Sequence, residues 1–287
     1  MPNAISQNIS WSRRFKNHLA LGTIATAALI VTAPLFVILG TIIYRGVGGL
    51  SVDFFTQLPK PIGETGGGMA NAMVGSLMIL GLASLIGVPL GIGTGIFLAE
   101  YGRNRYGNVV RFTADVLNGV PSIVIGITAS AIVVARQRHF SMTAGAVALG
   151  IMMVPIVSRT TEEVLLLVPH PIREAALGLG TAQWRTTLSV VLPSAMSGVV
   201  TGVLLAFARI AGETAPLLFT SLGNDYWNFK LDRPTSALPV QIFKYATSPY
   251  DDWHAKAWTG ALVLVTMILL TTVAFRFVTS RGVKEAG

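Results

Sequence analysis

The sequence predicts an all-α membrane protein, a bundle of six transmembrane helices. Two observations support this fold class. First, 52% of the 287 residues are hydrophobic and only 12% are charged, whereas soluble domains carry about 25% charged residues. Second, six stretches without a charged side chain are each at least 19 residues long, enough for a helix to cross about 30 Å of hydrocarbon. Because lipid offers the backbone no hydrogen-bond partner, such stretches must be helical.

The six predicted spans account for most of the chain. They are residues 19–43, 70–99, 116–135, 140–158, 186–208 and 257–275. The first is too long for the apolar core of a signal peptide, so we expect it to be retained. The uncharged run 214–224 has only 11 residues, and we interpret it as a continuation of the fifth span. The predicted organisation is a cytoplasmic segment (1–18), a first transmembrane helix (19–44) and a transmembrane domain (70–279).

The distribution of Lys and Arg predicts the orientation in the membrane. Loops on the same side as the N-terminus hold eleven of these residues and loops on the other side hold eight. Positive charge favours the cytoplasm, so we predict a multi-pass membrane protein with both termini in the cytoplasm. The formal charge of +8 is explained by membrane-flanking residues and does not indicate nucleic-acid binding.

Missing residues and motifs argue against an enzyme. The chain has no cysteine, which excludes disulfides, thiolate metal sites and a cysteine nucleophile. It has no phosphate-binding loop, nucleophile elbow or zinc-protease motif, and its four histidines are scattered. We therefore predict no catalytic residue, no metal site and no cofactor in this chain.

A short pattern lies between the fourth and fifth predicted spans, in a loop covering residues 169–193. We expect a helical run beginning at Glu174, a tight turn at Gly180 where a side chain would obstruct, and a new helix opened by Pro193. The loop resembles the EAA loop of ABC importer permeases, in which EAA, Gly and a branched residue before x-Leu-Pro recur at fixed offsets. The matching residues are Glu174, Ala175, Ala176, Gly180, Val190, Leu192 and Pro193.

This resemblance implies a function for the loop. In that family the segment forms a coupling helix that docks into a groove of the ATPase subunit. ATP would then be bound by a separate partner chain, which agrees with the missing phosphate-binding loop. The residues that would couple to the ATPase are Glu174, Ala175, Ala176, Gly180 and Pro193.

Charged residues at the cytoplasmic ends of two spans predict local ion pairs. Arg159, Glu162 and Glu163 have i, i+3 and i+4 spacing, so Arg159 can pair with either carboxylate. We interpret this triplet as a helix end that braces the coupling loop, although an intramembrane ion site is an alternative. Asp115 has Arg111 at i−4 and is expected near the cytoplasmic end of its span, where it can either reach water or pair with Arg111.

Small residues at i+4 spacing predict close helix packing in several spans. One stripe, Gly87, Gly91 and Gly95, lies in the second span. In the third span Asp115, Gly119, Ser122 and Gly126 are expected to share a face, with a kink at Pro121. The fifth span contains a stripe that ends in two charges: Ser194, Gly198, Gly202, Ala206, Arg209 and Glu213.

Arg209 is the most informative charged residue of the fifth span. At 1.5 Å per residue it lies roughly 22 Å from Ser194, past the middle of the bilayer. An intramembrane cation at a helix interface is by default a site for something negative. Residues 208–220 and 237–243 resemble the PstA-type permeases of bacterial phosphate ABC importers rather than their PstC-type partners, and this resemblance implies that Arg209 and Glu213 lie on the substrate path.

We hypothesise that Glu213 holds Arg209 when the path is empty and that phosphate replaces the carboxylate during transit. The alternative is a permanent structural ion pair at a subunit interface. Replacing Glu213 by Gln distinguishes them, because a structural role predicts loss of the assembled complex and a transit role predicts an intact complex with altered uptake.

The predicted function is a permease subunit of an ATP-driven phosphate importer. The implied partners are a PstC-like permease, two copies of a PstB-like ATPase, a periplasmic PstS-like phosphate-binding protein, phosphate and membrane lipid. One alternative keeps the architecture and changes the oxyanion to sulfate or molybdate. A second is a transporter that needs no ATPase, but the sequence shows neither inverted repeats nor paired broken helices.

Overall fold

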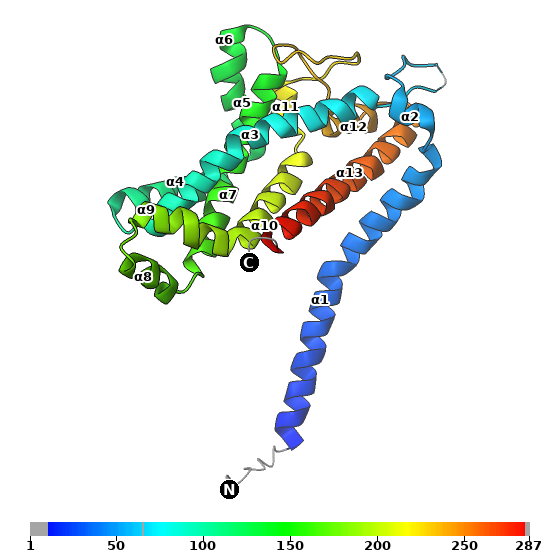
Figure 1. Cartoon of the computed structure of the whole chain (residues 1–287). Coiled ribbons are helices and arrows are strands. Elements are labelled where there is room, and N and C mark those ends of the chain that lie inside the picture. The colour runs from blue at the N-terminus through cyan, green and yellow to red at the C-terminus, as the bar shows by residue number, and fades with distance from the viewer. Residues whose placement is uncertain (1–10, 65, 285–287) are drawn as a thin grey trace.

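The computed structural model describes residues 11–64 and 66–284, with side chains as far as Phe277. The described residues fold into helices joined by short loops (Figure 1). In chain order the helices are α1 (Trp11–Gly46), η1 (Val47–Gly49), α2 (Val52–Thr56), α3 (Ala70–Glu100), α4 (Arg105–Gly119), α5 (Ser122–Ala129), η2 (Ser130–Val134), α6 (Ala135–Gln137), α7 (Met142–Leu166), α8 (His170–Gly178), α9 (Gln183–Thr186), η3 (Thr187–Val191), α10 (Leu192–Ala211), α11 (Ala215–Thr220), α12 (Leu238–Ala246) and α13 (Asp251–Lys284).

Five of these helical segments are long and apolar enough to cross a membrane. They correspond to the first, second, fourth, fifth and sixth predicted spans, and each is longer than its prediction by one or more residues. The all-α fold class and these five helices are therefore confirmed. The helices are longer because each continues into polar or charged residues at its ends, where the backbone can still hydrogen-bond along the helix.

The third predicted span is wrong as a single helix. Residues 105–119 and 122–137 form two helical arms, and the direction of the chain bends by 105° between them. Val120 adopts an extended backbone conformation, with φ −70° and ψ 131°, directly before Pro121. Proline excludes the preceding residue from the helical region, so the predicted kink becomes a break. The described part of the chain has six spans only if this bent pair counts as one broken span.

This break also overturns the predicted face of the third span. Gly119 and Gly126 lie on different arms and have different surroundings. No atom lies within 4 Å of a Cβ placed at Gly119, whereas a Cβ at Gly126 would lie 2.6 Å from Cα of Pro216 in α11. Gly126 therefore serves the contact between α5 and α11.

Helices α3 and α7 form the centre of the bundle and run parallel. A Cβ at Gly87 would lie 2.8 Å from Cβ of Met153, and at Gly91 it would lie 2.6 Å from Cβ of Val157. The prediction of close packing along this glycine stripe is confirmed, and its partner is α7 of the same chain. Gly95 continues the contact toward the C-terminal ends of both helices.

Helix α10 also packs against α7, runs antiparallel to it and contacts α3. Its small-residue stripe confirms the prediction, because Gly198 lies against Val164 and Gly202 lies against Thr160. Both glycines allow the two backbones to approach closely. Helices α4, α5 and α11 contact α7 as well, and 67% of its apolar window is buried.

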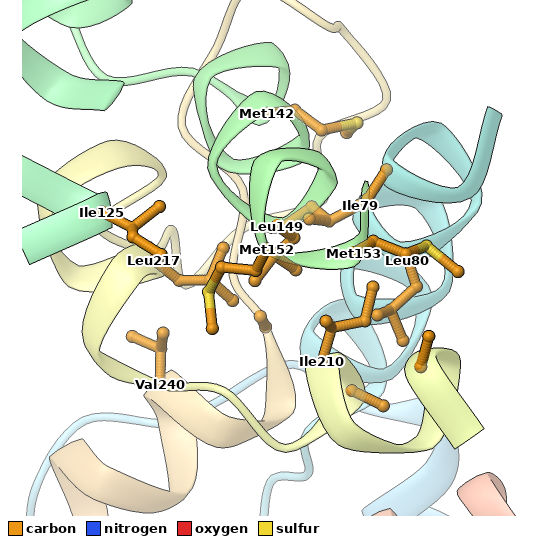
Figure 2. Packing of buried hydrophobic residues seen from close by; sticks show 14 of the residues in the cluster. Ile79, Leu80, Ile125, Met142, Leu149, Met152, Met153, Ile210, Leu217 and Val240 are labelled. Carbon is orange, nitrogen blue, oxygen red and sulfur yellow. The ribbon is translucent and has the colours of Figure 1, made fainter. Parts of the chain in front are cut away.

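The main apolar cluster joins α3, α7 and α10 to the short helices α11 and α12 (Figure 2). Side chains from these helices point toward one another in Figure 2, with Leu217 and Val240 reaching in from the two short helices. Leu217 is 2% exposed, so α11 is held inside the bundle. By contrast, α1 projects away from the bundle in Figure 1 and packs only near its C-terminal end, where Gly46 lies against Leu262 of α13.

Candidate functional site

Two regions hold the residues predicted to be functional. One is the coupling segment, which we define as α8, the turn after it and α9. The other is the break between α10 and α11. They lie at different ends of α10, because the coupling segment precedes this helix and the break follows it.

The coupling segment consists of a helix, a turn and a second helix, but α8 begins at His170, so the prediction that the helical run begins at Glu174 is wrong. Glu174, Ala175 and Ala176 lie on α8, and Gly180 follows with φ +82°. This left-handed conformation favours glycine. The predicted reason for the glycine was wrong, because no atom lies within 4 Å of a Cβ built there. Thr181 fixes the turn by donating its hydroxyl to the carbonyl of Ala176 at 2.6 Å.

Apolar side chains are exposed on the coupling segment. None of the α8 residues is buried, Leu179 is 86% exposed and Trp184 is 57% exposed. The guanidinium of Arg185 lies 5.4 Å from the centre of the Trp184 ring. Exposed leucine and tryptophan with a nearby cation are typical of a surface that another protein covers.

Pro193 does not open a helix, so that prediction is wrong. The helix begins at Gln183 and runs without interruption to Ala211. It contains a π-helical turn, Thr187–Val191, directly before the proline. A proline inside a helix has no N–H to donate and clashes with the carbonyl four residues earlier. The wider π-helical turn accommodates this defect and leaves the helix continuous.

The break between α10 and α11 separates the two charges of the predicted substrate path. Arg209 lies on α10 and is exposed, whereas Glu213 lies beyond the end of that helix and is half-buried. The prediction that both continue one helical stripe is wrong. Pro216 has no N–H for the carbonyl of Gly212 and would clash with it. The helix therefore ends at Ala211, and residues 214–224 do not extend the fifth span.

The two charges also do not pair in this chain. The ion pairs among residues 11–64 and 66–277 do not include Arg209 with Glu213. The backbone N–H of Glu213 donates to the carbonyl of Ile210 at 3.1 Å. This bond holds the chain close to the end of α10. Arg209 is therefore presented on the surface of an apolar helix with its charge unneutralised by that carboxylate.

Helix α11 fixes the position of this break. Its Pro216 lies against Gly126 of α5, and the carbonyl of Thr220 accepts a hydrogen bond from the N–H of Ser141 at 3.0 Å. Thr220 is completely buried. The break is thus anchored to α5 and to the start of α7, so Arg209 and Glu213 have defined positions.

A third group of charges lies where α4 crosses α7. Nη1 of Arg159 lies 2.8 Å from Oε2 of Glu162, which confirms that predicted pair, and Glu163 is exposed. Of the two expectations for Asp115, the pair with Arg111 is wrong, because Asp115 pairs with Arg159 at 3.1 Å. Arg111 instead places Nε 2.6 Å from Oε1 of Glu162. The crossing of α4 over α7 brings Arg111 to the buried carboxylate that Arg159 already contacts from within α7.

Another ion pair involves residues that we did not predict to be functional. Nη2 of Arg173 in α8 lies 3.0 Å from Oε1 of Glu100 at the end of α3. The residues are 73 positions apart (173 minus 100), which no helical spacing can connect. The only sequence signal is that each charge ends or follows an apolar run. In the described part of the chain, no group of His, Cys, Asp or Glu is placed to hold a metal ion.

The membrane-spanning helices agree with the comparisons. A profile of the family described as binding-protein-dependent transport system inner membrane component matches residues 91–282. The phosphate transport system permease protein PstA of Yersinia pestis is 47% identical over 93% of this chain and 90% of its own length. The PstA protein of Haemophilus influenzae is 44% identical over 92% of this chain and 94% of its own.

Solved structures support the same fold. A chain of a bacterial alginate ABC transporter, solved with an alginate-bound periplasmic protein, has a TM-score of 0.69 and 11% identity, and covers 96% of this chain and 98% of its own. A chain of the inward-facing MetNI methionine ABC transporter has a TM-score of 0.59 and 16% identity, with 76% and 96% covered. The chain is a multi-pass membrane protein that belongs to the family of binding-protein-dependent transport system inner membrane components, in its group of PstA permease proteins.

Proposed function

We propose that this chain is a transmembrane permease subunit of an ATP-driven phosphate importer and forms half of its translocation path. The observation that carries the proposal is the 47% identity with a phosphate transport permease over 93% of the chain. Both relatives described above are phosphate transport permeases, so a permease of a different oxyanion and a transporter independent of ATP are not favoured.

The partners follow from the proposed role. A second permease, PstC-like, would complete the path, and two PstB-like ATPase subunits would bind and hydrolyse ATP, so this chain itself would be non-catalytic. A PstS-like periplasmic protein would deliver phosphate. In this arrangement both termini and the coupling segment face the cytoplasm of a bacterium, and the subunit lies in its inner membrane.

Arg209 is the residue that we propose for phosphate passage. An exposed arginine on an apolar helix is costly against lipid, and Glu213 does not neutralise it within this chain. A guanidinium presents several N–H groups that bind a phosphate oxyanion in a bidentate manner. The half-buried carboxylate of Glu213, fixed close by in sequence, would limit how tightly the anion is held.

The coupling segment is the surface that we propose for the ATPase. Leu179 and Trp184 are exposed and would provide apolar anchors. Glu174, Ala175 and Ala176 lie together on α8. The Gly180 turn sets the direction in which α9 and α10 continue. Pro193 would act at a distance from the contact, through the π-helical turn that it follows.

The decisive experiment measures ATP-dependent phosphate uptake in proteoliposomes containing the chain with its permease, ATPase and binding-protein partners. We expect Arg209→Ala to lower uptake about 10- to 100-fold per assembled complex, as for loss of a hydrogen-bonded charge. The matched control is Arg136→Ala, an exposed arginine at the outer end of the bent pair, which should leave uptake unchanged.

Glu213→Gln separates the two interpretations of the break. An intact complex with altered uptake supports a role in transit, whereas loss of the complex supports a structural role. Uptake that persists unchanged in Arg209→Ala would remove Arg209 from the substrate path. Uptake of sulfate or molybdate in place of phosphate by the wild-type complex would change the substrate.

A further inference from the structure

The structure offers few contacts through which the coupling segment can act on the transmembrane helices. None of the α8 residues is buried as a whole, and this helix packs mainly against η3 and α9, its neighbours in the chain. Through η3 these contacts lead to α10 and, at Val191, to a buried apolar cluster that includes Ala99 of α3 and Leu165 of α7. A polar connection to α3 and α7 runs through the side chain of Arg173.

Arg173 is the least exposed charged side chain of α8. Its side chain is 12% exposed, and that of Glu100 is 8% exposed. Nη2 lies 3.0 Å from Oε1 of Glu100 and 2.6 Å from the carbonyl oxygen of Leu165 at the end of α7. One guanidinium thus connects three helices. A pair this buried differs from a surface ion pair, because removing either partner leaves an uncompensated charge.

The main chain at Glu100 is also close to the coupling segment. Nε2 of Gln183, at the start of α9, lies 3.5 Å from the carbonyl oxygen of Glu100. Both helices of the coupling segment therefore contact Glu100. Arg173 of α8 contacts its side chain, and Gln183 of α9 contacts its backbone carbonyl. The cation also lies beside the carbonyl ends of α3 and α7, where the helix dipole favours positive charge.

A second guanidinium holds the same turn of α3 from the other side. Arg111 of α4 donates to the carbonyl oxygens of Leu98 and Gly102, each at 2.9 Å, and pairs with Glu162 of α7. The turn around Glu100 is consequently fixed to α4 and α7 as well as to α8. Since α3 packs on α7 through Gly87, Gly91 and Gly95, the two helices share a tight interface and form one stiff unit.

We infer that Arg173 and Glu100 are positioning residues that transmit movement of the coupling segment to the parallel helices α3 and α7. This inference rests on the proposed function, because it presumes that an ATPase moves α8. It assigns to Arg173 a role separate from the exposed surface that contacts the ATPase. Arg173 is the link inside the permease, and Leu179 and Trp184 are the contacts outside it.

The test compares phosphate transported with ATP hydrolysed in proteoliposomes of the complete complex, normalised to assembled complex. Arg173→Met leaves Glu100 buried without its partner, so we pair it with the double variant Arg173→Met, Glu100→Met. The double variant contains no uncompensated charge and should assemble as well as the wild type. We expect its phosphate-to-ATP ratio to fall about tenfold while ATP hydrolysis continues.

A purely structural ion pair predicts the opposite for the double variant. It would recover both assembly and the wild-type ratio, which would overturn the inference. Arg173→Lys provides a second test, since an ammonium group retains the charge on a shorter side chain, whereas Arg173 reaches both Glu100 and Leu165 with its terminal Nη2. We expect a smaller fall in the ratio, and a wild-type ratio in this variant would also contradict the inference.

The matched control is Arg103→Met, which removes an exposed arginine three residues after Glu100. It should leave the ratio unchanged. Failure of the proposed function looks different, because the wild-type complex itself would then show no ATP-dependent phosphate uptake. If the wild type transports phosphate and the Arg173 variants keep its ratio, only the inference fails.

Discussion

Arginine has opposite roles in two regions of this protein. At the ends of α3 and α7, Arg111 and Arg173 are partly or largely buried, and each contacts a carboxylate and at least one backbone carbonyl. At the end of α10, Arg209 is exposed and has no ion pair with Glu213. The charges of the first two are compensated by carboxylates of their own chain. Arg209 has no such ion pair in the described part of the chain, and this contrast is the basis of our proposal that substrate or a second subunit completes the surface of α10.

The difference indicates how to distinguish structural charges from functional ones in a membrane protein. A buried charge that pairs with another group of the same chain stabilises the fold, and its loss should lower stability. An exposed charge on a spanning helix costs stability, so its loss should affect transport alone. The following predictions test this comparison in order of decreasing effect on stability.

Glu162→Ala should have the largest effect. The carboxylate is 3% exposed and receives both Arg111 and Arg159. Arg159 keeps its pair with Asp115, so Arg111 is the guanidinium that loses its carboxylate. We expect about 3–5 kcal/mol of destabilisation, measured by thermal unfolding of the purified subunit in detergent. The control is Glu163→Ala, its exposed neighbour, which should change the unfolding temperature little. Equal effects of the two variants would contradict the structural role of the network.

Gly91→Ala should have the next largest effect. A Cβ there would lie 2.6 Å from Cβ of Val157, so α3 and α7 must separate. Overpacking of this kind costs about 1–3 kcal/mol. Gly93→Ala is the matched control, because no atom lies within 4 Å of a Cβ at that position. If both variants unfold at the same temperature, the glycine stripe does not set the approach of the two helices.

Gly180→Ala should cost about 1–2 kcal/mol, because a residue with a Cβ is disfavoured at φ +82°. The strain is local to the turn after α8, so ATPase binding should weaken more than global stability does. Binding of the ATPase to the permease in detergent provides the measurement. Gly178→Ala, in a helical conformation with open space around it, serves as the control and should bind normally.

Arg209→Ala should have the smallest effect on stability, within about 0.5 kcal/mol, as for surface substitutions. The same variant is expected to lose uptake. Thermal unfolding and uptake measured on one preparation provide the test. A large fall in unfolding temperature would show that Arg209 stabilises the fold, as Arg111 and Arg173 do, and would remove the contrast between the two regions.

The prediction of the fold succeeded where hydrophobicity alone decides the structure. Five long helices follow from the length of the apolar runs, because a backbone in lipid must satisfy its hydrogen bonds within the helix. The prediction of the third span as one helix failed because Pro121 and the residue before it break the helix. The length of an apolar run gives no information about a bend of 105°. Pro193 shows the reverse, since a helix that the sequence suggested would begin there continues through it by means of a π-helical turn.

For the candidate site, the coupling pattern was visible because its residues are close in sequence. The ion pair of Arg173 with Glu100 was invisible because it joins residues from separate helices. Asp115 illustrates the same limit. Its i−4 neighbour Arg111 has suitable helical spacing, but α4 crosses α7, so Arg111 pairs with Glu162 and Asp115 pairs with Arg159.

The sequence by itself determined the membrane class, the helical segments, the coupling pattern and the presence of an arginine in an apolar helix. These properties depend on composition and on spacing within one helix. The tertiary structure decided which charges neutralise each other, where α10 ends and which glycines carry helix contacts. Those outcomes depend on the angles at which helices cross, and the crossing angles follow from the packing of all the side chains together.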